Sequence, residues 1–215
     1  MNVNIADLRK EYSKKELNLE QVDNSPLQQF KIWFEEAILA EVPEPNAMVL
    51  ATVSESGKPS ARVILLKGIT ENGFTFFTNY FSKKGNDLKS TAFVAATFFW
   101  PQLERQVRLQ GWTEKTTDSV SDEYFNSRPR KSQLGAWASP QSNVVENRDY
   151  LEKKLLDAEK EFEGSEIPRP PHWGGYIIHP ESIEFWQGRP SRLHDRILYT
   201  WRKDNFHWKI DRLAP

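Results

Sequence analysis

The first strong pattern in the chain is an apolar stripe at helical spacing after Ser25. Ser25-Pro26-Leu27-Gln28 is typical of a helix start, because serine can cap the first turn, proline suits the first helical position and glutamine can complete a capping box. Pro43 and Pro45 are expected to end the helix. The helix is most simply a packing element, and its apolar face is predicted to comprise Leu27, Phe30, Trp33, Phe34 and Ile38.

From Ala47 onward the pattern shortens to that of strands separated by turn residues. Glu55-Ser56-Gly57-Lys58-Pro59 and Thr70-Glu71-Asn72-Gly73 are typical turns, so the first strands are expected to form an antiparallel meander. No internal repeat or linker is evident, and we predict one domain, residues 1–215, in which helices surround an antiparallel barrel of α+β class. The predicted strands are 48–53, 61–67, 74–79, 92–100, 104–112, 173–178, 183–186, 193–201 and 206–213.

Four further helices are predicted. Residues 1–16 carry Ile5, Leu8 and Tyr12 at helical spacing, although the residues alone favour a frayed, solvated terminus. A short helix is expected near Asn86, and another over residues 117–128. The last is a charged amphipathic helix over 142–162, with Leu151, Leu155 and Leu156 predicted to pack inward.

Composition limits the possible functions. The 215 residues carry a net charge of -1, so no global field directs the protein to nucleic acid or to a membrane, and an anion site must be a local cluster. The chain contains no cysteine, which rules out disulfides, thiolate metal sites and a cysteine nucleophile. No metal site is predicted. The amino terminus lacks the apolar core of a signal peptide, and we expect a soluble, cytoplasmic protein.

Hydroxyls and two lysines gather where a strand runs into a short helix. Thr78, Ser82, Lys83 and Lys84 lie at this junction, where free backbone N–H groups and the helix dipole favour an anion such as phosphate. The motif is common on surfaces, and no P-loop or dinucleotide fingerprint accompanies it. A nucleoside triphosphate site is therefore unsupported.

Two charges flank an apolar strand nearby. Arg62 and Lys67 are five residues apart, so a regular strand points them to opposite faces. One site can use both if the strand bends near Gly68 or if the site wraps around the strand end. Otherwise both charges end a core strand in solvent.

A second polar pattern has a spacing of four. Tyr124, Arg128 and Ser132 form one stripe if the helix continues past Pro129, and Arg128 could then grip a phosphate with two donors. Proline would bend such a helix. The stripe is a second candidate phosphate cradle.

The segment Arg192-Leu193-His194-Asp195-Arg196 is the third candidate. Read as a strand, it places Arg192, His194 and Arg196 on one face, with Trp186 and Gln187 just upstream. Three basic groups on one face suit an anionic or electron-rich ligand. Taken alone, a solvated basic strand is the simpler explanation.

Together these motifs identify a family. The chain resembles the pyridoxine (pyridoxamine) 5'-phosphate oxidases over nearly its whole length. The resemblance rests on several short motifs in a fixed order, which together are highly specific. They are residues 62–67 (RVILLK), 104–107 (ERQV), 124–130 (YFNSRPR), 135–139 (GAWAS), 141–142 (QS), 184–188 (EFWQG) and 192–196 (RLHDR).

The resemblance implies a homodimer of FMN-binding split β-barrels with FMN at the subunit interface. Two positions depart from many relatives, which carry arginine at Lys83 and tyrosine at Phe77. The first departure loses a bidentate fork and the second a hydroxyl, and either would weaken FMN retention. By resemblance the cofactor-binding residues are Arg62, Val63, Ile64, Leu65, Leu66, Lys67, Phe77, Thr78, Ser82, Lys83, Lys84, Gln106, Gln141, Ser142, Trp186 and Arg196.

The resemblance also implies an activity of vitamin B6 metabolism, the oxygen-dependent oxidation of pyridoxine and pyridoxamine 5'-phosphate to pyridoxal 5'-phosphate with release of hydrogen peroxide. Residues 1–20 would form an N-terminal lid, and Arg189 receives no catalytic role. Arg192 and His194 would be catalytic and would face the pyridine ring. The other substrate-binding residues would be Arg9, Tyr12, Lys67, Tyr124, Arg128 and Ser132.

Two alternatives stay open. A split-barrel flavin reductase or another flavin-binding relative would share the fold, but would not need a second phosphate cradle. A non-enzymatic vitamin-phosphate carrier or a nucleic-acid module belongs to a different class. The net charge of -1 and the lack of a long basic run argue against nucleic acid.

Overall fold

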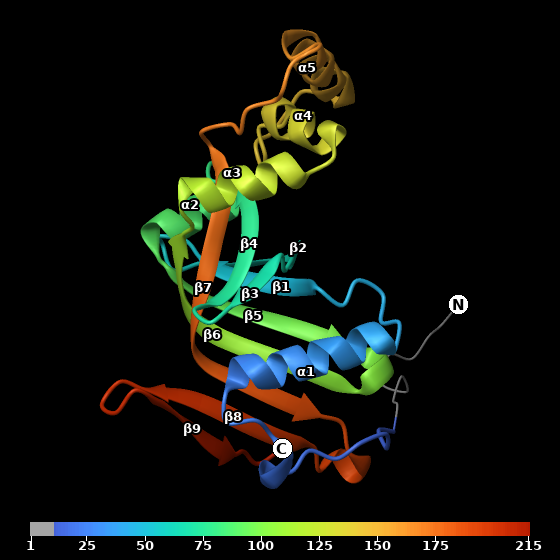
Figure 1. Ribbon diagram of the computed structural model, residues 1–215, viewed down its shortest axis with the longest axis vertical. Helices are drawn as coiled ribbons and strands as arrows, with labels where there is room; N and C mark the ends of the chain where they lie inside the picture. Colours follow the sequence, from blue (N-terminus) through green and yellow to red (C-terminus); the bar gives the residue numbers. More distant parts are fainter. Residues whose placement is uncertain (1–10) are drawn as a thin grey trace. The chain divides into compact units, whose positions relative to one another are not determined.

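The computed structural model describes residues 11–215 and has the α+β architecture of an antiparallel split β-barrel with helices around it (Figure 1). The hydrogen-bonded strand order is β2-β1-β5-β6-β7-β4-β3, and β8 pairs with β7 and β9. The helices are α1 (Pro26–Leu39), α2 (Lys83–Ser90), α3 (Asp118–Ser127), α4 (Arg130–Ala138) and α5 (Arg148–Glu161). The strands are β1 (Ala47–Val53), β2 (Pro59–Leu65), β3 (Gly68–Thr70), β4 (Gly73–Asn79), β5 (Phe93–Trp100), β6 (Arg105–Lys115), β7 (Trp173–Gln187), β8 (Asp195–Arg202) and β9 (His207–Arg212).

The chain forms two compact units, each described here by itself. Unit 1 comprises residues 1–49, 95–110 and 180–215, and unit 2 comprises residues 50–94 and 111–179. Long strands run through both, because β5, β6 and β7 each contribute residues to either unit. The boundary thus falls inside strands.

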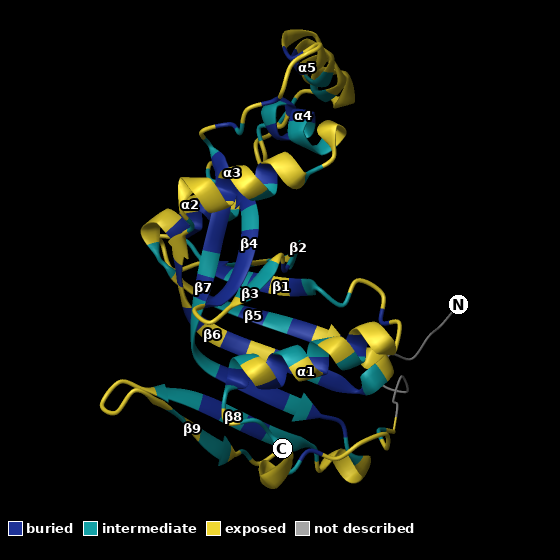
Figure 2. Cartoon of the chain, viewed as in Figure 1, coloured by how far each residue is buried: buried dark blue, intermediate teal, exposed yellow. Residues whose placement is uncertain are grey.

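In unit 1, helix α1 covers strands through aromatic contacts. The rings of Phe30 and Phe98 have centroids 4.9 Å apart, and those of Trp33 and Phe185 are 5.2 Å apart. Phe30 and Phe185 are fully buried. Figure 2 shows both buried and exposed stretches along α1. The end of β7 pairs with β8 in antiparallel register, with Trp186 opposite Arg196.

In unit 2, β4 pairs with the start of β7, with Phe77 opposite Gly175. Helices α3, α4 and α5 share a small core with that end of β7. Its buried residues are Phe125, Leu134, Ala136, Ala158, Phe162, Ile167 and Trp173.

The predicted start of α1 is confirmed, with one correction. The Ser25 side chain accepts a hydrogen bond from the Gln28 N–H, and Pro26 is the first helical residue. The Ser25 N–H donates to the Asp23 carboxylate at 2.7 Å and not to Gln28, so the capping box is not formed. Ile38 is 53% exposed, so its place in the buried stripe was wrong, and Ala37 occupies that face.

Three other expectations are corrected. Residues 173–187 form one continuous strand, and the predicted break at residues 179–182 is not present. The strand after Arg192 begins only at Asp195, so Arg192, His194 and Arg196 do not share a strand face. Helix α3 ends before Arg128, which caps it in an extended conformation, so no continuous helical stripe reaches Ser132.

The predicted terminal and charged helices also differ from the structure. Residues 11–16 are not helical, and the rest of the first predicted helix lies outside the described residues. The charged helix starts at Arg148, and Leu156 on it is 55% exposed, contrary to the predicted inward packing. Within residues 11–215, no helix is long and apolar enough to cross a membrane.

Candidate functional site

Unit 2 holds a cationic cluster at the start of α2. Ser82 caps this helix by accepting a hydrogen bond from the Gly85 N–H. The Lys84 ammonium donates to the Thr78 hydroxyl at 3.0 Å and to Gln141 Oε1 at 3.1 Å. These partners are neutral, so Lys84 brings a charge to the helix N-terminus without a carboxylate beside it.

The surroundings of Lys84 also disfavour the positive charge of its ammonium group. Burial lowers the pKa of Lys84, and repulsion from Arg62 lowers it further. Two cations therefore lie near each other at a helix N-terminus, where backbone N–H groups already favour negative charge. A bound phosphate would reverse both effects, so these residues fit one.

Lys83, the neighbouring predicted phosphate ligand, has a different environment. Its ammonium lies 3.0 Å from Asp87 Oδ1, one helical turn along α2. Asp87 is buried, accepts a hydrogen bond from the Thr52 hydroxyl at 2.7 Å and lies 3.9 Å from Arg62 Nη2. Burial opposes ionisation of this carboxyl, but Thr52, Lys83 and Arg62 outweigh it, and the pKa of Asp87 is lowered.

Arg62 is fixed by β1 and β2. Its Nη1 donates to the Leu50 carbonyl at 3.1 Å and to the Thr52 hydroxyl at 2.8 Å, and its Nη2 donates to Ser60 Oγ at 2.6 Å. The guanidinium thus has a defined orientation.

The strand that carries Arg62 is interrupted just before Gly68, which is one of the two conditions under which a single site could use both Arg62 and Lys67. Strand β2 ends at Leu65, and a new strand begins at Gly68, so Leu66 and Lys67 join two strands. Leu66 is buried, whereas the Lys67 side chain is exposed. Of the predicted cofactor strand, Val63 is 66% exposed, and Ile64 and Leu65 are partly buried.

A second cation group of unit 2 surrounds Arg128. Its guanidinium lies 4.6 Å from the centroid of the Trp173 ring, and its Nη1 is buried without a hydrogen-bond partner within the described part of the chain. Burial lowers the pKa of Arg128. An unpaired buried guanidinium nitrogen is costly, so this site calls for an anion.

Aromatic rings fix the surroundings of Arg128. Tyr124 stacks on Phe77 with centroids 3.9 Å apart and lies parallel to Trp173 at 6.1 Å. Phe77, predicted to lie near the cofactor, therefore connects β4 to the Arg128 group. Ser132 lies in the first turn of α4 and is partly buried, and Ser142 lies in an exposed loop at φ 71°.

Unit 1 brings together another set of predicted residues. The Trp186 and His194 rings have centroids 4.6 Å apart, and Tyr12 meets both edge-on, at 5.7 Å and 5.9 Å. Tyr12, which the resemblance assigns to an N-terminal lid, thus lies against Trp186 and His194. Arg9, the other predicted lid residue, lies outside the described residues.

The loop before β8 presents Arg192 and orients His194. Ser191 and Arg192 both have positive φ, 56° and 61°, which is strained for residues other than glycine. The Arg189 N–H donates to His194 Nδ1 at 3.1 Å, so the proton of the neutral ring lies on Nε2. Burial and the nearby Arg192 charge both lower the pKa of His194.

Arg196 is already paired within unit 1. Its Nε and Nη2 donate to the two Glu184 oxygens at 2.8 Å and 3.1 Å, and its Nη1 donates to the Ala214 carbonyl. Arg108 lies 3.5 Å from the same carboxylate. Gln106, also predicted for the cofactor, is partly buried on β6.

Sequence reasoning missed the acidic and aromatic partners of these cations. Asp87 could have been found, because it lies four residues after Lys83 on the predicted helix. Glu184 was part of a recognised motif, but its pairing with Arg196 depends on the register of β7 and β8. Nothing local in the sequence indicates that Trp173 lies under Arg128.

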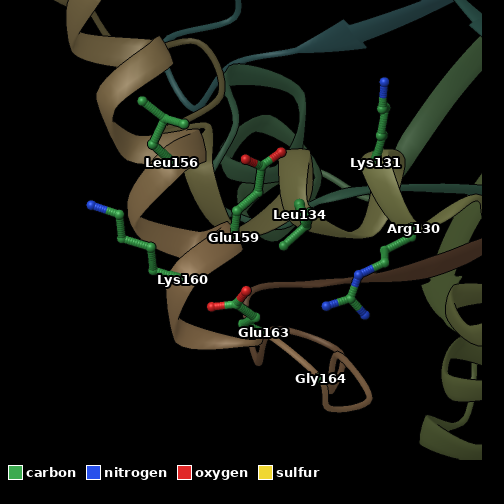
Figure 3. A pocket seen from close by; sticks show the side chains of 8 residues that line it. All are labelled: Arg130, Lys131, Leu134, Leu156, Glu159, Lys160, Glu163 and Gly164. Atoms are coloured by element: carbon green, nitrogen blue, oxygen red, sulfur yellow. The ribbon is translucent and has the colours of Figure 1, made fainter.

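Hollows lie at the surface of unit 2, and two of them bear on the site. One of about 590 Å³ lies beside α4 and α5, and its lining mixes Arg130, Lys131 and Lys160 with Glu159 and Glu163 (Figure 3). No predicted site residue lines it. The other, of about 290 Å³, borders the Lys84 group through Gln141.

The sheet, its surrounding helices and the cationic clusters define a protein of the split-barrel class. Residues 34–160 match the model of the pyridoxamine 5'-phosphate oxidase family, and residues 173–215 match that of the pyridoxine 5'-phosphate oxidase C-terminal dimerisation region. The chain belongs to the pyridoxine/pyridoxamine 5'-phosphate oxidase family, which makes it an enzyme. The recognition made from short motifs is confirmed.

Relatives agree over the full length. The pyridoxine/pyridoxamine 5'-phosphate oxidase of Nostoc punctiforme is 54% identical over 215 residues and covers 100% of both chains. That of Burkholderia mallei is 55% identical over 212 residues, covering 98% of this chain and 99% of its own. Among solved structures, PhzG from Burkholderia lata in complex with tetrahydrophenazine-1-carboxylic acid has a TM-score of 0.88 at 29% identity, covering 94% of this chain and 100% of its own. A pyridoxamine 5'-phosphate oxidase-related, FMN-binding protein of Nostoc punctiforme has the same fold, with a TM-score of 0.70 at 17% identity, covering 90% of this chain and 100% of its own.

Proposed function

We propose that the protein oxidises pyridoxine and pyridoxamine 5'-phosphate to pyridoxal 5'-phosphate, with FMN as cofactor, oxygen as acceptor and hydrogen peroxide as by-product. The observation that carries this proposal is the pair of cation groups in unit 2, one around Lys84 and one around Arg128. Neither Lys84 nor Arg128 has a carboxylate partner among residues 11–215. Cofactor and substrate each bring one phosphate, and two anion sites suit two phosphates.

We assign the Lys84 group to the FMN phosphate. Lys84, Thr78 and Gln141 already converge, and the capped N-terminus of α2 adds backbone donors. Arg62 adds positive charge close by. Lys83 contributes less here than the resemblance implies, because it is paired with Asp87. The remaining cofactor-binding residues of the resemblance stay predictions.

We assign the Arg128 group to the substrate phosphate. The buried Nη1 of Arg128 supplies a donor for a phosphate oxygen, and the Tyr124 hydroxyl and Ser132 are the predicted companions. Stacking on Trp173 holds the guanidinium plane, so little side-chain entropy remains to be lost on binding. Lys67, exposed between β2 and β3, is the fourth proposed ligand.

FMN, held by the Lys84 group, would supply the redox chemistry for oxidation at substrate C4', with oxygen as the final acceptor. The protein's task is alignment, which can contribute up to roughly 7–11 kcal/mol of barrier reduction. Phosphate binding by Arg128 lends remote binding energy to that alignment. Arg192 would stabilise negative charge at the ring, and His194 would donate a hydrogen bond from Nε2, because its Nδ1 already accepts one from Arg189.

We further propose a cytoplasmic homodimer. The C-terminal match to a dimerisation region supports the dimer. Each unit also exposes large apolar strand residues, Val63 and Phe93 at 66% and 62% in unit 2, and Val49 and Phe99 at 44% and 56% in unit 1. Such apolar exposure along strands is typical of surfaces that a second subunit covers.

One experiment tests the function directly. The purified protein is expected to carry a yellow flavin spectrum that pyridoxine 5'-phosphate bleaches without air, and to consume oxygen when air is admitted. Unphosphorylated pyridoxine serves as the control, and it should react much more slowly at equal concentration. A colourless protein that binds pyridoxal 5'-phosphate would instead indicate a carrier.

A different flavin-dependent substrate is the second candidate. PhzG was solved with a tricyclic carboxylic acid, a ligand without phosphate. The Arg128 group and the much higher identity to pyridoxine/pyridoxamine 5'-phosphate oxidases favour the phosphorylated substrate. Flavin bleaching by tetrahydrophenazine-1-carboxylic acid but not by pyridoxine 5'-phosphate would reverse this preference.

A further inference from the structure

A buried glutamate of unit 1 faces the segment that carries Tyr12. Glu104 is 2% exposed, and its Oε2 accepts hydrogen bonds from the N–H groups of Ser13 and Lys14 at 2.9 Å and 3.0 Å. Within residues 11–215 no ion pair is formed by this carboxylate. Its charge is therefore balanced by two consecutive backbone donors of a segment about ninety positions away in sequence.

The backbone of Glu104 is also unusual. It has φ 55° and ψ 40°, a left-handed conformation that glutamate seldom adopts. Its carbonyl accepts hydrogen bonds from the Gly188 N–H at 2.8 Å and from Gln187 Nε2 at 3.3 Å. One residue thus contacts the Tyr12 segment through its side chain and the Trp186 strand end through its backbone.

Gly188 provides the space for Tyr12. A Cβ at position 188 would lie 2.7 Å from Tyr12 Cγ, closer than real Cβ contacts allow, and 3.1 Å from Glu104 Cβ, which is tighter than most. The Tyr12 ring therefore rests directly on the Gly188 backbone, in edge contact with Trp186 and His194.

The segment is held again a few residues later. Leu17 is buried, its N–H donates to Asp195 Oδ2 at 3.1 Å, and its carbonyl accepts from Arg212 at 3.0 Å. This second anchor keeps the segment attached to unit 1 if the Glu104 contacts are lost. Loss of Glu104 should therefore release Tyr12 locally without detaching residues 17 onward.

We propose that Glu104 and Gly188 are positioning residues that hold Tyr12 against Trp186 and His194, and so set how tightly substrate is enclosed. This rests on the proposed function, because it gives Tyr12 its substrate-binding role. Glu104 acts through Tyr12 and touches no reacting atom. Its loss is expected to raise the KM for pyridoxine 5'-phosphate and to leave kcat nearly unchanged.

The first test does not depend on activity. Hydrogen exchange of the Ser13 and Lys14 amides, followed by NMR on the full-length protein, should accelerate about tenfold or more in Glu104→Ala, since each amide loses a charge-assisted hydrogen bond. Glu104→Gln keeps a side-chain oxygen and should restore most of the protection. Lys14→Ala is the matched control, because it removes the contact of Lys14 Nζ with the Gln102 carbonyl and keeps both amides. Unchanged protection in Glu104→Ala would overturn the proposal, whatever the enzyme's substrate.

The second test uses kinetics. Tyr12→Ala and Glu104→Ala should each raise the KM about tenfold, and the double variant should be no worse than either alone, because both remove the same contact. Gly188→Ala should displace the Tyr12 ring while keeping the Glu104 carboxylate. Its KM therefore tests the position of Tyr12 even if Glu104→Ala does not fold. Additive effects of Tyr12 and Glu104 would contradict the proposal. Wild-type protein without oxidase activity would instead contradict the proposed function, and the exchange result would still stand.

Discussion

Two pairs of cations, one pair in each unit, differ in their partners. In unit 1, Arg196 is paired with both oxygens of Glu184, and Arg105 donates to Glu36 at 2.8 Å and stacks over Trp33. In unit 2, Lys84 has neutral partners, and Arg128 keeps a buried nitrogen without one. Cations with internal carboxylates hold strands and helices together, whereas we propose that Lys84 and Arg128, which lack them, bind external anions.

The difference separates residues of the same chemical type. The sequence motifs alone would assign four cations equally to ligand binding: Arg196, Lys83, Lys84 and Arg128. The pairing of Lys83 with Asp87 and of Arg196 with Glu184 makes these two at least partly structural. Four predictions follow from this contrast, beginning with the largest expected effect.

Replacing Arg128 should have the largest effect on catalysis. Arg128→Ala removes a charge-assisted contact to the substrate phosphate, and kcat/KM for pyridoxine 5'-phosphate should fall about 100-fold, mostly through KM. Arg130→Ala is the matched control, because Arg130 donates to the Phe162 and Ser165 carbonyls, and it should lower stability while leaving KM unchanged. An unchanged KM in Arg128→Ala would place the substrate phosphate elsewhere.

Lys84 and Lys83 should differ in cofactor binding. Lys84→Met removes the charge without a carboxylate partner and should weaken FMN binding by roughly tenfold or more, as measured by quenching of flavin fluorescence on titrating the apoprotein. Lys83→Met should weaken it less, because Lys83 is paired with Asp87. The reverse order would show that the Lys83–Asp87 pair opens on binding.

Disrupting the Arg196–Glu184 pair should affect stability more than ligand binding. Glu184→Gln leaves Arg196 and Arg108 without their shared carboxylate, and should lower the free energy of unfolding by about 2 kcal/mol in urea denaturation. FMN affinity should change less than in Lys84→Met. A loss of FMN binding with unaltered stability would show that Arg196 binds the cofactor instead of stabilising the fold.

The smallest expected effect concerns pH. Burial and Arg192 lower the pKa of His194 below its ordinary 6.5, so the neutral ring persists to more acidic pH than a free imidazole. If the neutral Nε2–H donor is required, the acidic limb of kcat/KM should fall below 6.5, and Arg192→Gln should shift that limb upward. Nitrogen NMR of the ring gives an independent reading, with the proton expected on Nε2.

Much of the fold could be predicted because its signals are local. The α1 start at Ser25-Pro26 and the strands around the 55–59 turn follow from caps and alternation. The continuity of β7 could not be predicted, because residues 179–182 include Pro180 among polar residues and lie between the stretches of β7 that pair with β4 and with β8. Leu156 satisfied the helical period and is exposed, since periodicity does not reveal which face finds a partner.

The candidate site could likewise be predicted only in part. The motifs and their resemblance identified the family, and the spacing of Tyr124 and Arg128 indicated a phosphate cradle. The condition set for that cradle is not met, because the helix stops at Ser127, and the cradle itself stays a prediction. Arg128 instead lies over the ring of Trp173. Arg192 and His194 were assigned to a strand, yet the left-handed backbone at Ser191 and Arg192 delays the strand to Asp195. Such conformations depend on distant contacts and leave little trace in local sequence.

The left-handed pair Ser191-Arg192 has a consequence for how mutations here are read. Alanine at position 192 removes the guanidinium but still has to adopt the unfavourable left-handed backbone. Glycine removes the guanidinium and adopts that backbone without steric cost. The free energy of unfolding of Arg192→Gly should therefore exceed that of Arg192→Ala by roughly 0.5–1 kcal/mol, although both variants lack the guanidinium. Comparing the two separates the chemistry of the guanidinium from the conformational stress of its loop, a distinction that alanine scanning alone would miss.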